Sequence, residues 1–299
     1  NSGAEATDGL IKIIRKYHYT KGNKHKTKII VFDNAFHGRT LTGILAGSTE
    51  GHREGFLPYK KTNGGFIRVK FDNIEEVENV IDDKVAGIFL EPIQGEGGIN
   101  VANLTFLNTL RKICNKHKLI LALDEVQSGI GRTGKMFAYQ WSKAKPDIMG
   151  IAKGLGGGFP VGAILTNSKL AKIVKPGMHG STFGGNYLAS TVALSVVTEI
   201  SKPHFLQKVI KMGNHLKNGL EKLSEKHSNK LFSFKGKGLI LGIRCNKSNQ
   251  DICNIARKKG LLLVAASNNV VRLLPPLTVN KQEINIALKL LDETLKEIS

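Results

Sequence analysis

The chain has 299 residues, of which 41% are hydrophobic, and its 44 Lys and Arg against 24 Asp and Glu give a formal net charge of +20. This length and hydrophobic content support one large or two moderate domains with packed cores. No apolar run reaches the roughly 18–20 residues that span a bilayer, and the N-terminal residues lack the basic and apolar segments of a signal peptide.

The positive charge suggests a nucleic-acid partner, but its distribution argues against one. The lysines are spread over the whole chain and often alternate with acidic residues, as in LKNGLEKLSEK at 216–226. Aromatic residues make up only 6% of the chain, so we expect no platform for stacking bases and no nucleic-acid partner. The cysteines, Cys114, Cys245 and Cys253, are far apart and odd in number, which disfavours disulfides or a zinc site and predicts a cytoplasmic protein.

In the first two thirds of the chain, short apolar runs flanked by turn residues are typical of strands buried on both faces of a mainly parallel sheet. Segments with helical periodicity lie among these runs, so the pattern predicts an α/β fold. The predicted helices are 4–17, 74–81 and 104–117, and the predicted strands are 27–32, 85–92, 118–125, 146–154 and 160–167.

After residue 186 the pattern changes to longer helices and a second set of strands. It predicts a smaller α+β domain, with a boundary near 200 that divides the chain into domains 1–200 and 201–299. The predicted helices are 186–201, 205–225, 251–259 and 281–298, and the predicted strands are 231–236, 238–245, 261–266 and 270–275.

The extreme N-terminus carries a helix-start signal. Ser2 followed by Glu5 matches a capping box, which predicts a helix that begins near Ala4. The free N–H groups and the dipole of such a helix end favour an anion there. A helix cap without a ligand is the alternative interpretation.

The loop at 126–136 nearly matches two nucleotide-binding motifs. Gly129, Gly134 and Lys135 have P-loop spacing, but Met136 stands where Ser or Thr would bind magnesium. The glycines also begin too far after the preceding strand for a dinucleotide fold. We therefore expect neither motif to function here.

Asp124 and Lys153 form a pair of candidate catalytic residues. Asp124 ends the apolar run ILALD, and Lys153 ends the next predicted strand among small and apolar neighbours. The ends of neighbouring parallel strands meet at one sheet edge, where ligands bind in open α/β folds. A dry, glycine-rich surround should destabilise the ammonium form and favour an imine-forming amine. A lysine that forms an imine and an aspartate that contacts a pyridinium nitrogen together suggest pyridoxal 5′-phosphate (PLP). The alternative interpretation is a lysine that is merely exposed in a loop.

Motifs distributed over the whole chain carry a resemblance to a known family. They are NSGAEA (1–6), NAFHGRT (34–40), LEPIQGEGG (90–98), LDEVQSGIGRTGK (123–135), IAKGLGGGFPVGA (151–163), HGSTFGGN (179–186) and VVRLLPPLTV (270–279). In these segments the chain closely resembles the class-III, fold-type-I PLP-dependent aminotransferases. The resemblance implies a large, mostly parallel mixed-sheet domain that binds PLP and a smaller C-terminal α+β domain.

The resemblance also implies a role for each matching residue at the cofactor. Lys153 matches the lysine that holds PLP and moves protons between the substrate carbon and the cofactor, and Asp124 matches the partner of the pyridine nitrogen. The other implied contacts are Gly3 and Ala4 at the phosphate, Phe36 and Val126 on the two ring faces, Gln127 at the 3-hydroxyl, and Thr182 at the phosphate of the neighbouring subunit in a homodimer.

Four further residues match substrate contacts. Ser181 and Arg39 resemble residues that contact an acylornithine, Arg39 through a carboxylate. Arg272 matches the residue that binds the α-carboxylate of glutamate or 2-oxoglutarate, and Glu96 matches a gate that pairs with this arginine in the other half-reaction. A permanent structural ion pair between Glu96 and Arg272 is the alternative.

The implied reaction moves the δ-amino group of N-acetylornithine to 2-oxoglutarate and gives the semialdehyde and glutamate, as in arginine biosynthesis. Similar motifs serve aminotransferases for ornithine, succinylornithine, succinyl-diaminopimelate and 4-aminobutyrate. Family members carry a further N-terminal segment before NSGAEA, so we expect this chain to be N-terminally incomplete and to fold poorly or show little activity alone. A truncated, inactive remnant or a basic binding protein is the remaining alternative.

Overall fold

The computed structural model describes residues 1–56 and 63–298. By their internal contacts these residues form two compact units. The division into domains 1–200 and 201–299 stays a prediction. It does not foresee that two short segments from the first 200 residues group with the second unit. The first unit comprises Asn1–Pro92, Ala102–Ile130 and Ala138–Glu199, and the second comprises Ile93–Val101, Gly131–Phe137 and the chain from Ile200 onward.

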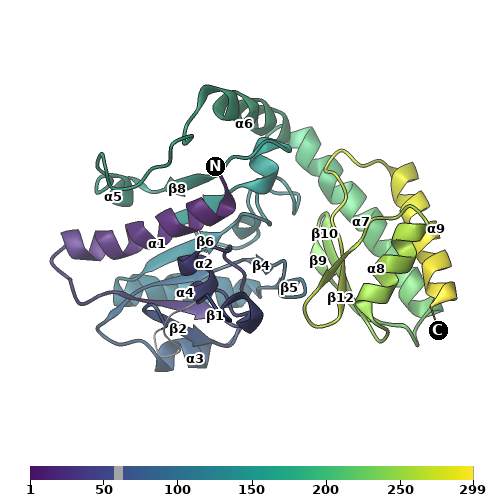
Figure 1. Cartoon of the computed structure of the whole chain (residues 1–299), viewed down its shortest axis with the longest axis horizontal. Coiled ribbons are helices and arrows are strands. Elements are labelled where there is room, and N and C mark those ends of the chain that lie inside the picture. The colour runs from purple at the N-terminus through teal and green to yellow at the C-terminus, as the bar shows by residue number, and fades with distance from the viewer. Residues whose placement is uncertain (57–62, 299) are drawn as a thin grey trace. The chain divides into compact units, whose positions relative to one another are not determined.

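A six-stranded sheet forms the framework of the first unit (Figure 1). Its strand order is β2-β1-β3-β6-β7-β8. All neighbouring strands pair in parallel except β7 and β8, which are antiparallel. The mostly parallel, mixed sheet predicted from the sequence is therefore confirmed. The strands are β1 (Lys28–Phe32), β2 (Phe66–Val69), β3 (Val85–Leu90), β6 (Ile120–Asp124), β7 (Ile148–Ile151) and β8 (Ala163–Thr166).

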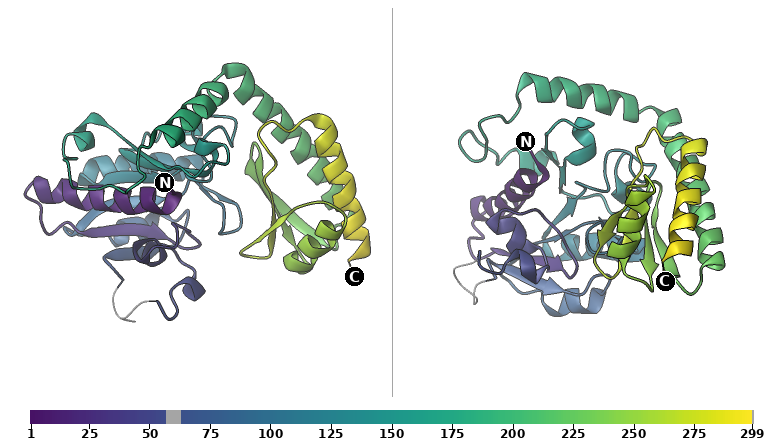
Figure 2. Two further views of the ribbon diagram at one scale, coloured as in Figure 1. Left: turned by 45° about the horizontal axis from the view of Figure 1, so that its top comes forward. Right: turned by 45° about the vertical axis from the view of Figure 1, so that its right-hand side comes forward.

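Helices cover both faces of this sheet because side chains alternate along each strand (Figure 2). Val31 of β1 belongs to one core with Leu10 of the first helix. The next residue, Phe32, faces the other side, where its ring meets Phe106 edge-on at a centroid distance of 5.7 Å. The two helices are α1 (Gly3–Thr20) and α4 (Leu104–His117), both close to their predicted ranges.

The second unit is an antiparallel sheet with helices packed against it, in the strand order β11-β12-β10-β9. Its core joins Leu216 and Leu220 of α7 to Leu241 and Ile243 of β10. The α+β character predicted for the C-terminal region is confirmed. The elements are α7 (Pro203–Lys226), β9 (Leu231–Lys237), β10 (Ile240–Cys245), α8 (Asn249–Lys258), β11 (Val264–Ala266), β12 (Val270–Leu273) and α9 (Lys281–Glu297).

The remaining elements are short, apart from α6. Of this set, α3 and α6 lie within the predicted helices 74–81 and 186–201. In the described part of the chain, no helix has both the length and the apolar composition of a membrane-spanning segment. These elements are α2 (Leu41–Ala46), η1 (Glu50–His52), α3 (Ile74–Asn79), β4 (Ile93–Gln94), β5 (Asn100–Val101), η2 (Ala138–Trp141), η3 (Lys153–Gly156), α5 (Ser168–Ala171) and α6 (Tyr187–Ile200).

Candidate active site

The N-terminus of α1 forms one wall of a cavity in the first unit. Ser2 is the N-cap, and its hydroxyl accepts a hydrogen bond from the Glu5 N–H at 3.3 Å. Gly3 and Ala4 line the cavity. The first N–H groups of a helix have no intrahelical acceptor, so this wall favours an anion. Glycine is needed at position 3, because a Cβ there would lie 2.8 Å from Cγ1 of Val126.

The cavity brings the predicted catalytic residues together. Its volume is ≈ 450 Å³, within the range of about 300–1,000 Å³ typical of small-molecule sites. Asp124 and Lys153 both line it. Asp124 is the last residue of β6, and Lys153 comes two residues after the end of β7, its parallel neighbour. An acid, an amine and a helix N-terminus thus meet in one cavity. The other predicted residues that line it are Gly3, Ala4, Phe36, Val126 and Gln127.

Both carboxylate oxygens of Asp124 accept hydrogen bonds. The side chain is buried, with only 5% of the residue exposed. Oδ1 accepts from the backbone N–H of Val126 at 3.0 Å, and Oδ2 lies 2.8 Å from Nδ1 of His37. The carboxylate is therefore held in one orientation at the cavity wall. No role for His37 was predicted from the sequence, although it follows the predicted ring contact Phe36 directly.

Lys153 departs from the expected surroundings. Its φ is +45°, a left-handed conformation that is rare for residues with a side chain and is concentrated at functional sites. The residue is exposed, so the dry surround predicted from the sequence is not present. The physical reason is that the neighbouring Gly154, Gly157 and Gly158 are exposed too and have no side chains to cover the amine.

A buried glutamate holds the loop that carries Phe36. Glu91 is 5% exposed and lines the cavity, and its Oε2 accepts a hydrogen bond from the Phe36 N–H at 3.0 Å. No role for Glu91 was predicted from the sequence. Arg39, two residues further than His37, is exposed and is not among the described residues that line the cavity. Its guanidinium carbon lies 6.0 Å from the centre of the Phe36 ring.

In the second unit, Arg272 and Glu96 form a bidentate ion pair. Nη1 of Arg272 lies 2.6 Å from Oε1 of Glu96, and Nη2 lies 3.0 Å from Oε2. The arginine is 5% exposed, whereas the glutamate side chain is 38% exposed. Removal of one partner from such a pair leaves a buried charge, which is costly unless another carboxylate replaces it. The pairing itself is the one predicted from the sequence.

Ser181 and Thr182 do not line the cavity of their own chain among the described residues. Both are exposed, in the segment that precedes α6. The Ser181 hydroxyl accepts a hydrogen bond from the Asn1 side-chain amide at 2.8 Å. Their predicted roles at a cofactor and a substrate remain predictions.

The donor set of the cavity suits PLP rather than a metal ion. Within the described residues, no group of three or more His, Cys, Asp and Glu is placed to hold a metal. A phosphate, an aldehyde and a protonated ring nitrogen would each find a matching partner in the helix N-terminus, Lys153 and Asp124. The residues present therefore fit this cofactor.

Residues 1–295 match the family model for class-III aminotransferases. Acetylornithine aminotransferase of Caldanaerobacter subterraneus subsp. tengcongensis is 46% identical over 301 residues, which cover 100% of this chain and 75% of that protein. Acetylornithine aminotransferase of Mesorhizobium japonicum is 45% identical over 288 residues, which cover 96% of this chain and 71% of that protein.

Solved structures of similar proteins share the fold. The ornithine aminotransferase from Toxoplasma gondii ME49 has a TM-score of 0.93 at 29% identity, over 99% of this chain and 71% of that one. Acetylornithine aminotransferase from Elizabethkingia anophelis has a TM-score of 0.84 at 33% identity, over 100% of this chain and 73% of that one. These similarities confirm the fold type predicted from the sequence motifs.

Proposed function

The chain belongs to the class-III aminotransferase family, and on this premise we propose that it moves the δ-amino group of N-acetylornithine to 2-oxoglutarate. The observation that carries the proposal is the meeting of Asp124, Lys153 and the N-terminus of α1 in one cavity. The donor is favoured by the curated relatives, which are acetylornithine aminotransferases over nearly the whole chain. The products are the semialdehyde and glutamate, as in arginine biosynthesis.

PLP, the cofactor of this reaction, supplies an aldehyde that takes up the amino group and a ring that withdraws electrons from the substrate carbon. In the chain, the N–H groups at Gly3 and Ala4 would bind the phosphate. The Asp124 carboxylate would hold the protonated ring nitrogen, and Lys153 would bind the aldehyde carbon. The ring would lie among Phe36, Val126 and Gln127, which line the same cavity.

The proton transfers belong to Lys153. Once the substrate amine has replaced Lys153 at the aldehyde carbon, the freed Nζ would accept the proton from the carbon that bears the substrate amino group, as a positioned general base. Asp124 keeps a negative charge in the cavity wall, which offsets positive charge on the ring nitrogen. These two groups stand at the ends of adjacent strands, so the sheet fixes their separation.

The ion pair of Arg272 and Glu96 suits an enzyme with two unlike substrates. We propose that Glu96 occupies the arginine while the amino donor reacts and gives way to a carboxylate of 2-oxoglutarate in the second half-reaction. The partial exposure of Glu96 supports this role, because the glutamate can leave without exposing a buried core. Ser181 and Arg39 are proposed contacts of the acylornithine, Arg39 through its carboxylate.

We propose a homodimer in which Thr182 reaches the phosphate site of the partner subunit. Support comes from large apolar side chains on and before α6 that the chain leaves exposed, because exposed apolar side chains close together in a helix favour an interaction surface. Thr182 lies in the same exposed segment. The exposed side chains are Phe183 at 70%, Tyr187 at 93%, Leu188 at 61% and Leu194 at 67%.

A cytoplasmic location is part of the proposal. All three cysteines are buried and free of disulfide bonds, as in a reducing compartment. Burial raises the pKa of the Cys114 thiol to about 12, which leaves it inert. We also retain the two-domain division, with PLP bound by residues 1–200 and a small domain from 201.

The cofactor is tested by loading the purified chain with PLP and locating a borohydride-fixed adduct by peptide mass spectrometry. The expected adduct is on Lys153. In Lys153→Ala the adduct is absent, and the rate falls by at least about a hundredfold, the lower end of the range for a general acid–base group. A wild-type chain that unfolds cooperatively, and so is folded, but binds no PLP would favour an inactive remnant instead.

The donor is tested by steady-state rates with N-acetylornithine, ornithine, succinylornithine, succinyl-diaminopimelate and 4-aminobutyrate. The proposal expects the highest kcat/KM with N-acetylornithine. Ornithine is the second candidate, because an ornithine aminotransferase has the higher of the two TM-scores given above. A higher kcat/KM with ornithine would leave the proposed amino transfer in place but show that the proposed amino donor is wrong.

A further inference from the structure

A buried histidine, His37, contacts Asp124 and stacks on Phe89 of the sheet. The His37 side chain is 0% exposed, and its Nδ1 lies 2.8 Å from Oδ2 of Asp124. Since a carboxylate accepts hydrogen bonds, the proton of this contact belongs to Nδ1. His37 and Asp124 both line the cavity, so this donor contacts the carboxylate at the ligand site itself.

The second ring nitrogen of His37 indicates the charge of the pair. Nε2 is buried and has no hydrogen-bond partner among the described residues. A proton there would leave a buried N–H donor unpaired, which is costly. The geometry therefore favours a neutral ring with its proton on Nδ1. The pair of His37 and Asp124 then keeps one net negative charge, which a protonated ring nitrogen of a ligand can neutralise.

The imidazole ring is held in place by packing and by its own backbone. It stacks on Phe89 of β3 with a centroid distance of 4.0 Å and an interplanar angle of 27°. The preceding residue, Phe36, is tied through its N–H to the buried carboxylate of Glu91. A ring confined in this way can direct its donor to only one place, Oδ2 of Asp124.

We propose that His37 is a positioning residue for the cofactor: its Nδ1–H fixes the Asp124 carboxylate in one orientation and leaves the charge of that carboxylate uncompensated. The backbone N–H of Val126 holds the other oxygen, so the two donors together define the plane of the carboxylate. This inference rests on the proposed function, because it assumes that Asp124 receives the ring nitrogen of PLP.

Two variants separate the hydrogen bond from the packing. His37→Asn keeps a side-chain N–H in reach of the position of Nδ1 but removes the ring from Phe89. His37→Phe keeps an aromatic ring on Phe89 but removes the donor. The dissociation constant of PLP is measured for each by equilibrium titration, and the unfolding midpoint is measured without PLP.

The expected result is that His37→Phe weakens PLP binding by about tenfold or more, as the loss of a hydrogen bond to a charged group should. His37→Asn should restore the affinity to within about threefold of wild type, even if its unfolding midpoint is lower, because the donor is retained. If the PLP affinities instead follow the unfolding midpoints, His37 is only a packing residue. If His37→Phe does not fold, His37→Asn alone decides, since a loss of about tenfold in that variant overturns the proposal.

A mutant cycle with Asp124→Ala tests whether His37 acts through Asp124. Without the carboxylate, His37→Phe should change the PLP dissociation constant by less than about twofold. Equal losses in both backgrounds would overturn the positioning role. Wild-type PLP binding and the Lys153 adduct are measured first, so failure of the proposed function is recognised before any His37 variant is compared.

Discussion

At the scale of single residues, Glu125 is a buried carboxylic acid whose pKa departs from its ordinary value. It follows Asp124 directly and is fully buried. Its oxygens accept hydrogen bonds from the Ser128 hydroxyl at 2.7 Å and from the N–H groups of Ala138 and Tyr139 at 3.0 and 2.8 Å. Burial outweighs these donors and raises the pKa of the Glu125 carboxyl to about 7.

This raised pKa makes the stability of the chain depend on pH. The unfolded carboxyl titrates near its ordinary value of 4.5 and the folded one near 7, so between these values the folded state binds more protons. The stabilising contribution is complete below pH ~4.5 and is lost as pH rises through about 7. Glu125→Gln should lack this loss, which is on the order of 1.4 kcal/mol for each pH unit between the two pKa values. Urea unfolding of both proteins from pH 5 to pH 8 checks this prediction. If the free energy of unfolding depends on pH in the same way in both proteins, the prediction is wrong.

The ion pair of Arg272 and Glu96 yields a prediction for catalysis. Glu96→Gln removes the competing charge, so the KM for 2-oxoglutarate should fall by about tenfold, equivalent to one hydrogen bond between charged groups. The rate of the N-acetylornithine half-reaction should not rise, because in that step Arg272 then lacks its carboxylate partner. Single-turnover rates of the two half-reactions measure this. If the ion pair has only a structural role, Glu96→Gln should instead lower the stability of the chain and slow both half-reactions equally.

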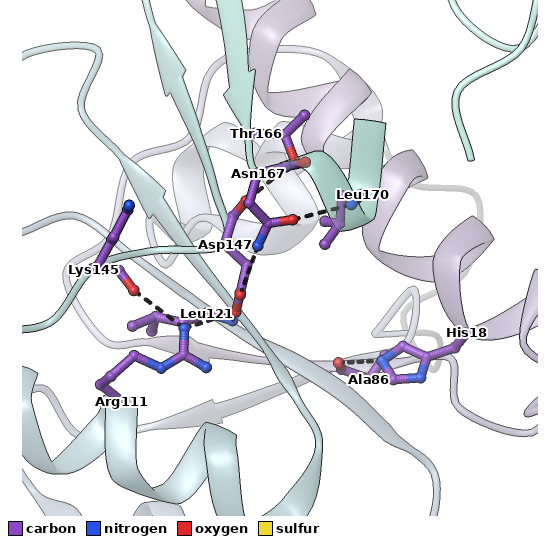
Figure 3. A network of polar contacts seen from close by, with 9 residues as sticks. All are labelled: His18, Ala86, Arg111, Leu121, Lys145, Asp147, Thr166, Asn167 and Leu170. Atoms are coloured by element: carbon purple, nitrogen blue, oxygen red, sulfur yellow. Dashed lines mark hydrogen bonds and ion pairs between the residues drawn. The ribbon is translucent and has the colours of Figure 1, made fainter. Parts of the chain in front are cut away.

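At the scale of elements, one half-buried aspartate joins a helix and three strands at the end of the sheet opposite to the cavity. Figure 3 shows Asp147 between the side chains of Arg111 and Asn167 and the backbone of Leu121. Its Oδ2 accepts from Arg111 at 2.8 Å and from the Leu121 N–H at 2.9 Å, and its Oδ1 accepts from Asn167 at 3.0 Å. Asn167 in turn caps α5 through the Leu170 N–H.

Loss of this junction should destabilise the first unit without touching the cavity. Asp147→Ala removes the shared acceptor of three donors, of which, among the described residues, only Arg111 keeps another contact, to the Lys145 carbonyl at 3.2 Å. We expect a loss of about 2–3 kcal/mol in the free energy of unfolding. The PLP dissociation constant should stay within about twofold of wild type, because Asp147 does not line the cavity. Asp83→Ala, at an exposed position, is the matched control and should change stability by less than about 0.5 kcal/mol. Equal urea midpoints for the two variants would contradict the role of Asp147.

The elements that could be predicted from the sequence are those with a strong local pattern. The continuous apolar runs of β1, β3 and β6 and the periodic stripes of α1 and α4 are examples. The edge strand β2 was not predicted, because Arg68 interrupts its apolar pattern; in the structure this side chain bonds to four backbone carbonyls instead. The six-residue α2 is too short for a periodic signal.

The same distinction applies to the site. Asp124 and Lys153 could be paired from the sequence because the topology of parallel strands brings their ends to one edge. The role of His37 could not, because it depends on burial against Phe89 and on the path of the loop after β1. The exposure of Lys153 was only the alternative interpretation, since local apolar composition does not say whether glycines leave a side chain uncovered.

At the scale of the whole molecule, the apolar face of α6 is the feature that a single chain leaves unexplained. Tyr187 and Leu194 are 93% and 67% exposed, and Thr182 lies just before them. A partner subunit on this face would bury these side chains and bring Thr182 to a second cavity. In the proposed dimer each site therefore combines Lys153 from one chain with Thr182 from the other.

Shared sites predict complementation between two inactive variants. Lys153→Ala removes the amine, and Thr182→Glu should repel the phosphate of PLP by placing a negative charge beside it. Alone, each variant should have little activity. When both are co-expressed with different tags, the purified heterodimer should contain one intact site of two, and an equal mixture of all dimers should recover about a quarter of wild-type activity. If Thr182 serves the cavity of its own chain, every site carries one defect and no activity returns. Leu194→Lys should prevent the recovery, because a charge on the apolar face opposes association, and light scattering would show monomers.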